Sequence, residues 1–249
     1  MLLTQINPAL NSKEFWDWTS EDLAKYDLPA EIEMVLQVSA QPKLVYLGYS
    51  RGTSQMFLAL GMDEDYYLPK VERVVAFSPC MYENMELLRP GGPMDYQQAV
   101  DFYEQMENEQ TYKINILEDI GGTPNSYKDL LYWEQISLED RPQRFIPLEE
   151  YADGNRHSEE ISLGAIDQMM IVGLAGTSDE SCSYETAKRI FSELGHSNTI
   201  LRPIIGADHG YTAWVTGDEW NNVLKQSIEG NETGDVQMMS VAQISTSIY

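Results

Sequence analysis

One pentapeptide in the first quarter of the chain has the residue types and spacing of an activated serine. Gly48-Tyr-Ser-Arg-Gly52 follows a short apolar run, residues 44–47, and leads into a segment with one apolar helical face, residues 51–60. In a strand–turn–helix context, G-x-S-x-G forms a nucleophile elbow, which exposes a serine hydroxyl on a sharp turn. The two glycines let neighbouring backbone approach where a Cβ would collide. We therefore predict that Ser50 is a nucleophile, with the backbone N–H of Arg51 beside it.

A serine becomes a good nucleophile only when a positioned base takes its proton. The chain has three histidines. His209 lies in a loop directly after the last expected strand, where the chain order Ser…Asp…His places the base of this type of site. His196 falls in a helix–strand turn and His157 in a polar stretch, so both are expected at the surface. His209 is the predicted base.

The base in turn needs an acid that fixes its tautomer. Asp179 follows the expected strand 169–174, and loops at the carboxyl ends of parallel strands carry active sites. Glu180 is its near rival. Asp208 ranks third, because successive side chains in a loop seldom face each other, and it adjoins His209. Asp179 is the predicted acid.

Other site types find no support in the sequence. There is no H-E-x-x-H, no P-loop and no G-x-G-x-x-G, and Cys80 and Cys182 are too far apart to form a ligand pair. No cofactor or metal is predicted. The two cysteines either pair with each other or are small buried residues.

The elements that must position these residues alternate along the chain. Apolar runs predict strands at 43–48, 74–77, 169–174 and 199–204, and helical periodicity predicts helices at 51–60, 183–194 and 218–228. This alternation indicates an α/β fold with a parallel sheet covered on both faces. Pro203 removes a ladder donor and predicts that the last strand is an edge strand.

Glycine and proline mark two helix boundaries. Gly61 is expected to end helix 51–60. A further helix, with Pro29 in its first turn, is expected to bury an apolar face. That face comprises Ile32, Val35, Leu36 and Ser39.

The rhythm changes between residues 81 and 163, where methionine, tyrosine and acidic residues dominate. Helices are expected at 95–107 and 125–137. We interpret the organisation as hydrolase core 1–80, inserted helical cap 81–163, second core part 164–230 and C-terminal tail 231–249. A Met- and aromatic-rich cap surface suits an apolar substrate, although a small satellite core explains the same residues.

The net charge of the chain limits which classes of partner it can bind. With 40 acidic and 16 basic residues the net charge is −24, which makes nucleic-acid binding improbable and disfavours anionic membranes. No run is long enough to be a transmembrane helix, and the first residues lack the basic and apolar regions of a signal peptide. At face value the protein is expected to be cytoplasmic.

Several segments together resemble one family, the gastric and lysosomal acid lipases. Gly48-Tyr-Ser-Arg-Gly-Thr53 resembles the family's G-H-S-Q-G-T, and Gly121–Gln135 is similar to its cap segment ending in H-W-x-Q. The run Glu14–Ala30 looks like the segment before the elbow. Gly176–Asp179 resembles the turn of the family's acid, and the loop from Asp208 to Trp214 resembles its histidine loop.

The resemblance implies an α/β-hydrolase that cleaves neutral lipid esters, triacylglycerols and cholesteryl esters, under a lid. It assigns Ser50 as nucleophile, Asp179 as acid, His209 as base, and the Arg51 N–H to the oxyanion hole. Such proteins are secreted or lysosomal. Tyr49 and Arg51 stand where the family has histidine and glutamine, and the cap is shorter.

The family also has an N-terminal portion with the first strands and a second oxyanion donor, so we expect a truncated or split member. Strand 43–48 would then have an open edge, through which the chain could associate with itself or another protein. The alternative to a lipase or esterase is therefore a weak or inactive hydrolase-fold protein that acts as an interaction module. Another serine hydrolase activity, thioesterase or peptidase, is also compatible with the elbow.

Overall fold

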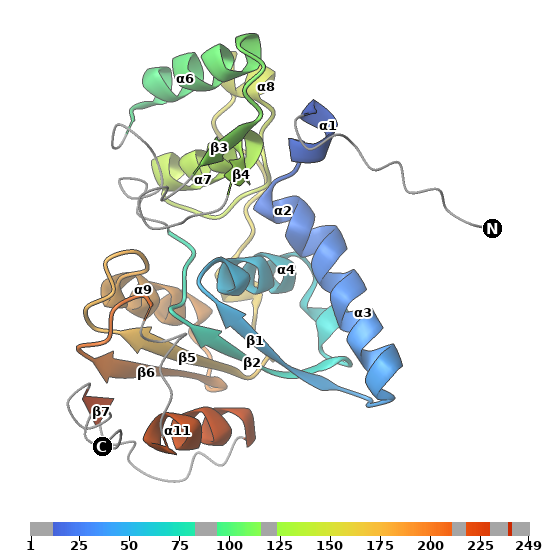
Figure 1. The fold of residues 1–249 in the computed structure, drawn as a ribbon, viewed down its shortest axis with the longest axis vertical. Coiled ribbons are helices and arrows are strands. Elements are labelled where there is room, and N and C mark those ends of the chain that lie inside the picture. Colours follow the sequence, from blue (N-terminus) through green and yellow to red (C-terminus); the bar gives the residue numbers. More distant parts are fainter. Residues whose placement is uncertain (1–11, 83–93, 116–123, 211–217, 230–238, 241–249) are drawn as a thin grey trace. The chain divides into compact units, whose positions relative to one another are not determined.

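The computed structural model describes residues 12–82, 94–115, 124–210, 218–229 and 239–240 (Figure 1). The chain divides into two compact units. The sheet unit comprises residues 24–82 and 161–249, and the helical unit comprises residues 1–23 and 83–160. The predicted cap, 81–163, has nearly the same limits as the second segment of the helical unit. Residues 12–23, which we expected in the hydrolase core, belong instead with the helical unit.

The sheet unit is built on a parallel sheet of order β1-β2-β5-β6-β7. Its strands are β1 Leu44–Tyr49, β2 Val71–Phe77, β5 Ile171–Gly176, β6 Thr199–Ile205 and β7 Met239–Ser240. Every residue of β5 is buried, as expected for a strand covered on both faces. The four strands expected from the sequence are all present.

Helices cover both faces of this sheet. Within the unit, Figure 1 shows α4 and α9 on one face and α11 on the other. Val223 of α11 packs in a buried cluster with Val75, Phe77 and Val172 of the strands. The helices are α3 Leu28–Ser39, α4 Arg51–Tyr67, α9 Tyr184–Leu194 and α11 Asp218–Glu229, with a π-helical turn Leu23–Asp27 before α3 and a 3₁₀ turn Leu163–Ala165. The predicted layered α/β architecture is confirmed.

The prediction that Gly61 ends the helix that begins at residue 51 is wrong. Helix α4 continues past Gly61, leaves helical geometry at Asp63 (φ −160°, ψ 76°), and resumes to Tyr67. A Cβ at position 61 would lie 2.7 Å from a side-chain carbon of Ile161. Gly61 therefore lets a distant segment approach the helix, and it does not act as a stop signal.

The prediction that strand 199–204 lies at an edge is also wrong. Strand β6 pairs with β5 on one side and with β7 on the other. The β7 pairing joins Ile204 to Met239 and Ile205 to Ser240, so it begins after Pro203. The missing N–H of the proline therefore interrupts nothing on that side. The edge of the described sheet opposite β7 is β1.

Helix α3 buries less than its apolar pattern predicts. Leu28 and Ile32 are buried, whereas Val35 is exposed and Leu36 is half-buried. Val38, on the same helix, has 77% of its surface exposed.

The helical unit is largely α-helical, with one small antiparallel ladder between β3 and β4. Its elements are α1 Lys13–Trp16, α2 Ser20–Asp22, α6 Tyr96–Asn108, β3 Lys113–Asn115, β4 Pro124–Ser126, α7 Tyr127–Glu139 and α8 Leu148–Ala152. Side-chain caps define three of the helix starts: Thr19 and Asp95 form capping boxes, and Ser126 accepts from the Asp129 N–H.

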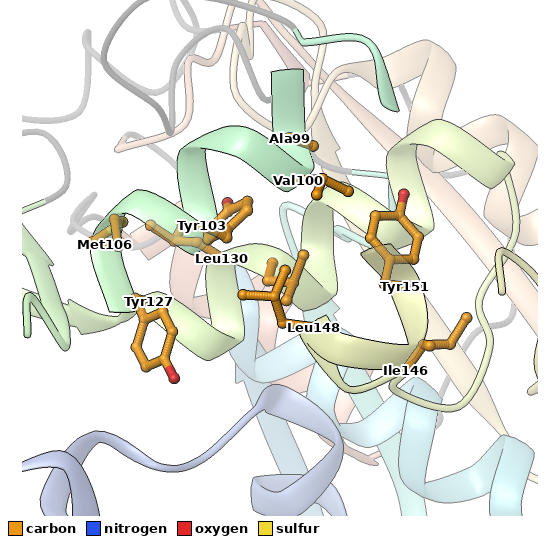
Figure 2. Close-up of a cluster of buried hydrophobic side chains, with 10 residues drawn as sticks. Ala99, Val100, Tyr103, Met106, Tyr127, Leu130, Ile146, Leu148 and Tyr151 are labelled. Atoms are coloured by element: carbon orange, nitrogen blue, oxygen red, sulfur yellow. The ribbon is translucent and has the colours of Figure 1, made fainter. Parts of the chain in front are cut away.

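The core of the helical unit is an aromatic and aliphatic cluster between α6, α7 and α8 (Figure 2). Tyr103 of α6, Leu130 of α7 and Tyr151 of α8 are almost fully buried in it. Both predicted helices of this region, 95–107 and 125–137, are present as α6 and α7. Among the described residues of either unit, no helix has the length and apolarity needed to cross a membrane.

Candidate active site

The elbow is a tight junction between β1 and α4. Ser50 has φ 51° and ψ −119°, a conformation that L-residues rarely adopt and that must be held in place by its surroundings. Its N–H donates to the Phe77 carbonyl of β2 at 2.9 Å. A Cβ on Gly48 would lie 3.0 Å from backbone atoms of Gly52, so glycine is required for the turn to close.

A half-buried tyrosine stabilises the same turn. The Tyr46 hydroxyl donates to the Gly52 carbonyl at 2.8 Å. Burial raises the pKa of Tyr46 to about 12, so the phenol keeps its proton and remains a donor.

Three side chains from three loops meet in the sheet unit. His209 Nε2 lies 2.9 Å from Ser50 Oγ, and His209 Nδ1 lies 2.9 Å from Asp179 Oδ2. The Asp179 side chain is 0% exposed and that of His209 is 26% exposed. A carboxylate facing Nδ1 favours the tautomer with hydrogen on Nδ1, which leaves Nε2 able to accept the serine proton.

The Asp179 carboxylate has a full set of partners. Its Oδ1 accepts the backbone N–H groups of Ser181 at 2.9 Å and Cys182 at 2.8 Å. A buried charge is tolerated when it is hydrogen-bonded in this way. The two rivals considered for the acid, Glu180 and Asp208, are exposed.

Tyr49 contacts His209 in two ways. Its hydroxyl donates to the His209 carbonyl at 3.0 Å, and its ring lies 5.1 Å from the imidazole, centroid to centroid. Burial raises the pKa of Tyr49, and the charges of Asp179 and Asp208 add to this effect. The sequence marked Tyr49 only as a departure from G-H-S-Q-G and gave no signal of this contact.

A disulfide joins Cys80 to Cys182 at the edge of the site. Cys182 Sγ lies 3.9 Å from Ser50 Oγ. The sequence left open whether these cysteines pair, because residues 102 positions apart give no local sign of contact.

The other candidates are placed as follows. Arg51 is the first residue of α4, and His157 is exposed, with its ring 2.9 Å from a carboxylate oxygen of Glu139. His196 is only half-buried.

Residues 211–217, which include Trp214 of the histidine loop, lie outside the described residues. Among the residues that are described, no cluster of three His, Cys, Asp or Glu side chains could hold a metal ion.

No protein-family model matches the chain. Segments of it are similar to curated lipases: it is 38% identical over 73 residues to Lipase lipl-3 of Caenorhabditis elegans and 38% identical over 69 residues to mouse gastric triacylglycerol lipase. It is also 41% identical over 51 residues to human lipase member M. Over these segments the chain is similar to proteins that are named as lipases. The three matches cover 29, 28 and 20% of this chain and only 18, 17 and 12% of those proteins.

Solved structures show the same fold over most of the chain. A putative hydrolase from Agrobacterium vitis has a TM-score of 0.51 at 15% identity, covering 86% of this chain and 70% of that one. Est1E from Butyrivibrio proteoclasticus has a TM-score of 0.51 at 14% identity, and the match covers 88% of this chain and 70% of Est1E. A soluble variant of monoglyceride lipase from Saccharomyces cerevisiae has a TM-score of 0.51 at 12% identity, and the match covers 86% of this chain and 69% of that one. The predicted α/β-hydrolase fold is confirmed.

Proposed function

We propose that this chain is a serine hydrolase that cleaves carboxylic esters, with Ser50 as nucleophile, His209 as general base and Asp179 as the acid that orients it. The observation that carries the proposal is the pair of 2.9 Å contacts that link the three side chains in that order. The strained backbone of Ser50 and the complete burial of the Asp179 carboxylate support it, because both are costly features with a direct use in this chemistry.

In the first half of the reaction, Ser50 Oγ bonds to the ester carbonyl carbon while its proton passes to His209 Nε2. The carbonyl electrons move to oxygen, and the N–H of Arg51, the residue after the nucleophile, is the proposed donor to that oxyanion. Collapse of the tetrahedral intermediate breaks the ester C–O bond. The departing alkoxide takes the proton from His209 and leaves an acyl-Ser50 ester.

In the second half, water attacks the acyl carbon and gives its proton to His209 Nε2. The second tetrahedral intermediate collapses, the carboxylic acid leaves, and Ser50 Oγ regains the proton. Throughout, Asp179 remains ionised and stabilises the imidazolium. No cofactor takes part in this proposal.

The proposed substrates are neutral lipid esters. The support is similarity alone: the related proteins are named as lipases, one of them as a triacylglycerol lipase. A role of the helical unit as a cap over an apolar substrate stays a prediction.

The decisive experiment uses a fluorophosphonate probe, which reacts with activated serines. The protein should be labelled at Ser50 and should hydrolyse p-nitrophenyl esters, and Ser50→Ala should lose both properties. Ser192→Ala, an exposed serine on α9, is the matched control and should retain both. Labelling of Ser50→Ala at the level of the wild-type protein would remove the hydrolase proposal. Emulsified triacylglycerol compared with the soluble ester then tests the lipid preference.

We also propose that two copies of the chain associate through β1. The supporting observation is that β1 is the last strand of the described sheet on its side, with Leu47 50% exposed and Val38 of the adjoining helix α3 77% exposed. An antiparallel pairing of two β1 strands would be self-complementary and would cover apolar surface.

Light scattering coupled to size-exclusion chromatography tests this association. A dimer is expected in the wild type and a monomer in Leu47→Lys, because a charged side chain blocks edge pairing. Since the net charge of −24 opposes self-association, the dimer should be favoured by higher salt. A wild-type monomer at every salt concentration would contradict the proposal and leave the hydrolase proposal untouched.

A further inference from the structure

The Cys80–Cys182 disulfide connects the loop after β2 to the loop after β5. Cys80 follows β2 and Cys182 follows β5, and their Cα atoms are 5.2 Å apart. Both residues are buried, each 2% exposed. The bond therefore lies inside the sheet unit, and its Cys182 Sγ is the atom 3.9 Å from Ser50 Oγ.

On one side the bond leads directly to the acid. The Cys182 N–H donates to Asp179 Oδ1, and the other carboxylate oxygen, Oδ2, faces His209 Nδ1. A displacement of Cys182 would therefore move or release one of the groups that fix the carboxylate. Since Asp179 aims the imidazole, the displacement would be passed on to His209.

On the other side the bond leads to the nucleophile. The Cys80 N–H donates to Thr53 Oγ1 at 2.9 Å, and the Cys80 carbonyl accepts the Ser54 hydroxyl at 2.8 Å. Thr53 in turn donates to the Ser50 carbonyl, from its hydroxyl at 2.6 Å and from its N–H at 2.8 Å. Thr53 and Ser54 are both fully buried in the first turn of α4.

We propose that the Cys80–Cys182 disulfide is a positioning element that holds the Asp179 loop in register with Ser50. This inference rests on the proposed function. The contacts form a closed circuit: Ser50 to Thr53, Thr53 to Cys80, the disulfide to Cys182, Cys182 to Asp179, Asp179 to His209, and His209 back to Ser50. The disulfide is the only covalent crosslink in this circuit besides the chain itself. The geometry it protects is strict, because a misplacement of about 1 Å at a catalytic group can cost about 100-fold in rate.

The test compares the oxidised protein with protein reduced by a phosphine and with the double variant Cys80→Ala/Cys182→Ala. Two fluorophosphonate readouts separate positioning from folding: the rate constant of labelling and the final fraction labelled. We expect the rate constant and kcat to fall about 10- to 100-fold with KM little changed, while the final fraction stays near one and reoxidation restores the rate. A bond that serves stability alone would lower the final fraction and leave the rate constant of the remaining molecules unchanged.

A second pair of variants keeps the disulfide and changes Thr53. This pair tests the positioning role if the protein without the disulfide does not fold. Thr53→Ala removes the hydroxyl that joins Cys80 to Ser50, and Thr53→Ser keeps it. Slow labelling of Thr53→Ala, rescued in Thr53→Ser, is the expected result. If the reduced protein stays folded and is labelled at the wild-type rate, the positioning role is overturned. If the reduced protein unfolds, labelling of Thr53→Ala at the wild-type rate overturns it. Absence of labelling in the oxidised wild type overturns the proposed function and this inference with it.

Discussion

The two units differ in where they bury polar side chains and in what those side chains contact. In the sheet unit the strands are mostly apolar, and buried polar groups such as Asp179, Thr53 and Ser54 gather where the strands end. Arg73 and Arg202 are buried on strands and reach Ser227 of α11. In the helical unit, polar side chains lie within the helices and their core.

These polar side chains of the helical unit bind backbone groups on other segments of the unit. Gln135 donates to the Ile146 carbonyl at 2.7 Å and accepts the Ile146 N–H at 3.0 Å. Ser126 donates to the Trp16 carbonyl at 2.6 Å, and Asp129 accepts the Ser20 N–H. Buried polar groups of the sheet unit thus surround the proposed active site, whereas those of the helical unit join its segments to one another.

Asp179→Asn is the most severe test of the first half of this comparison. The amide oxygen can still accept from Ser181 and Cys182, but its NH₂ group would face His209 and favour the wrong tautomer. We expect kcat for ester hydrolysis to fall by about 10⁴-fold, with a melting temperature close to that of the wild type. Glu180→Gln, at the exposed neighbour, is the control and should be nearly silent. Equal loss in both variants would contradict the assignment of the acid.

Gln135→Ala tests the second half of the comparison, with the opposite pattern of effects. It leaves two backbone groups of Ile146 buried without their partner, so the helical unit should lose about 2–4 kcal/mol of stability. Hydrogen exchange of the amides in α7 and of Phe145, Ile146 and Leu148 measures this loss. Gln105→Ala, an exposed glutamine paired with Glu109 on α6, should cost no more than about 0.5 kcal/mol. Similar exchange rates in the two variants would show that polar burial does not specify this unit.

Much of the sheet unit could be predicted from the sequence, because its information is local. Runs of apolar residues predict the buried strands, and five consecutive residues predict the elbow. The same logic placed Asp179 and His209 after their strands. Their catalytic roles, and that of Ser50, stay predictions.

The remaining features depend on contacts between distant residues. Gly61 has the position of a helix stop signal, and only its contact with Ile161 gives another reason for glycine there. The two-residue strand Met239–Ser240 is too short to give a strand signal before it pairs with β6. Residues 12–23 join the helical unit through hydrogen bonds to residues about a hundred positions away, such as Trp16 to Ser126. Buried polar residues read as surface residues in a sequence, so the rule that predicted the sheet unit could not predict these contacts.

Tyr127→Phe sharpens the comparison through pH. The Tyr127 hydroxyl donates to Glu107 at 2.6 Å and is the largest cause of the lowered pKa of that carboxylate; Lys13 contributes further. A lowered folded pKa stabilises the protein above the usual value of 4.5, and this contribution is lost as the pH falls through the folded pKa.

The variant should therefore cost about 1 kcal/mol at neutral pH, and the difference from wild type should shrink below the usual glutamate range. Denaturant unfolding at a series of pH values measures it. A difference that does not depend on pH would mean that the hydroxyl acts by packing alone.

Tyr49→Phe is the mildest change. It removes the donor to the His209 carbonyl and keeps the ring beside the imidazole. We expect kcat to fall roughly 2- to 10-fold, the equivalent of one neutral hydrogen bond. Tyr26→Phe, at an exposed tyrosine, should have no effect on turnover. If both variants match the wild type, His209 is held without help from Tyr49.

The disulfide also changes what a protease could do to this molecule. Cys80 and Cys182 flank residues 83–160 in sequence, so the bond closes a covalent ring that contains this whole stretch. One cut of the backbone inside the ring would open it without releasing a fragment. A clipped molecule would migrate as one band on a non-reducing gel and as two on a reducing gel, and it would keep Ser50, Asp179 and His209 in a single covalent entity.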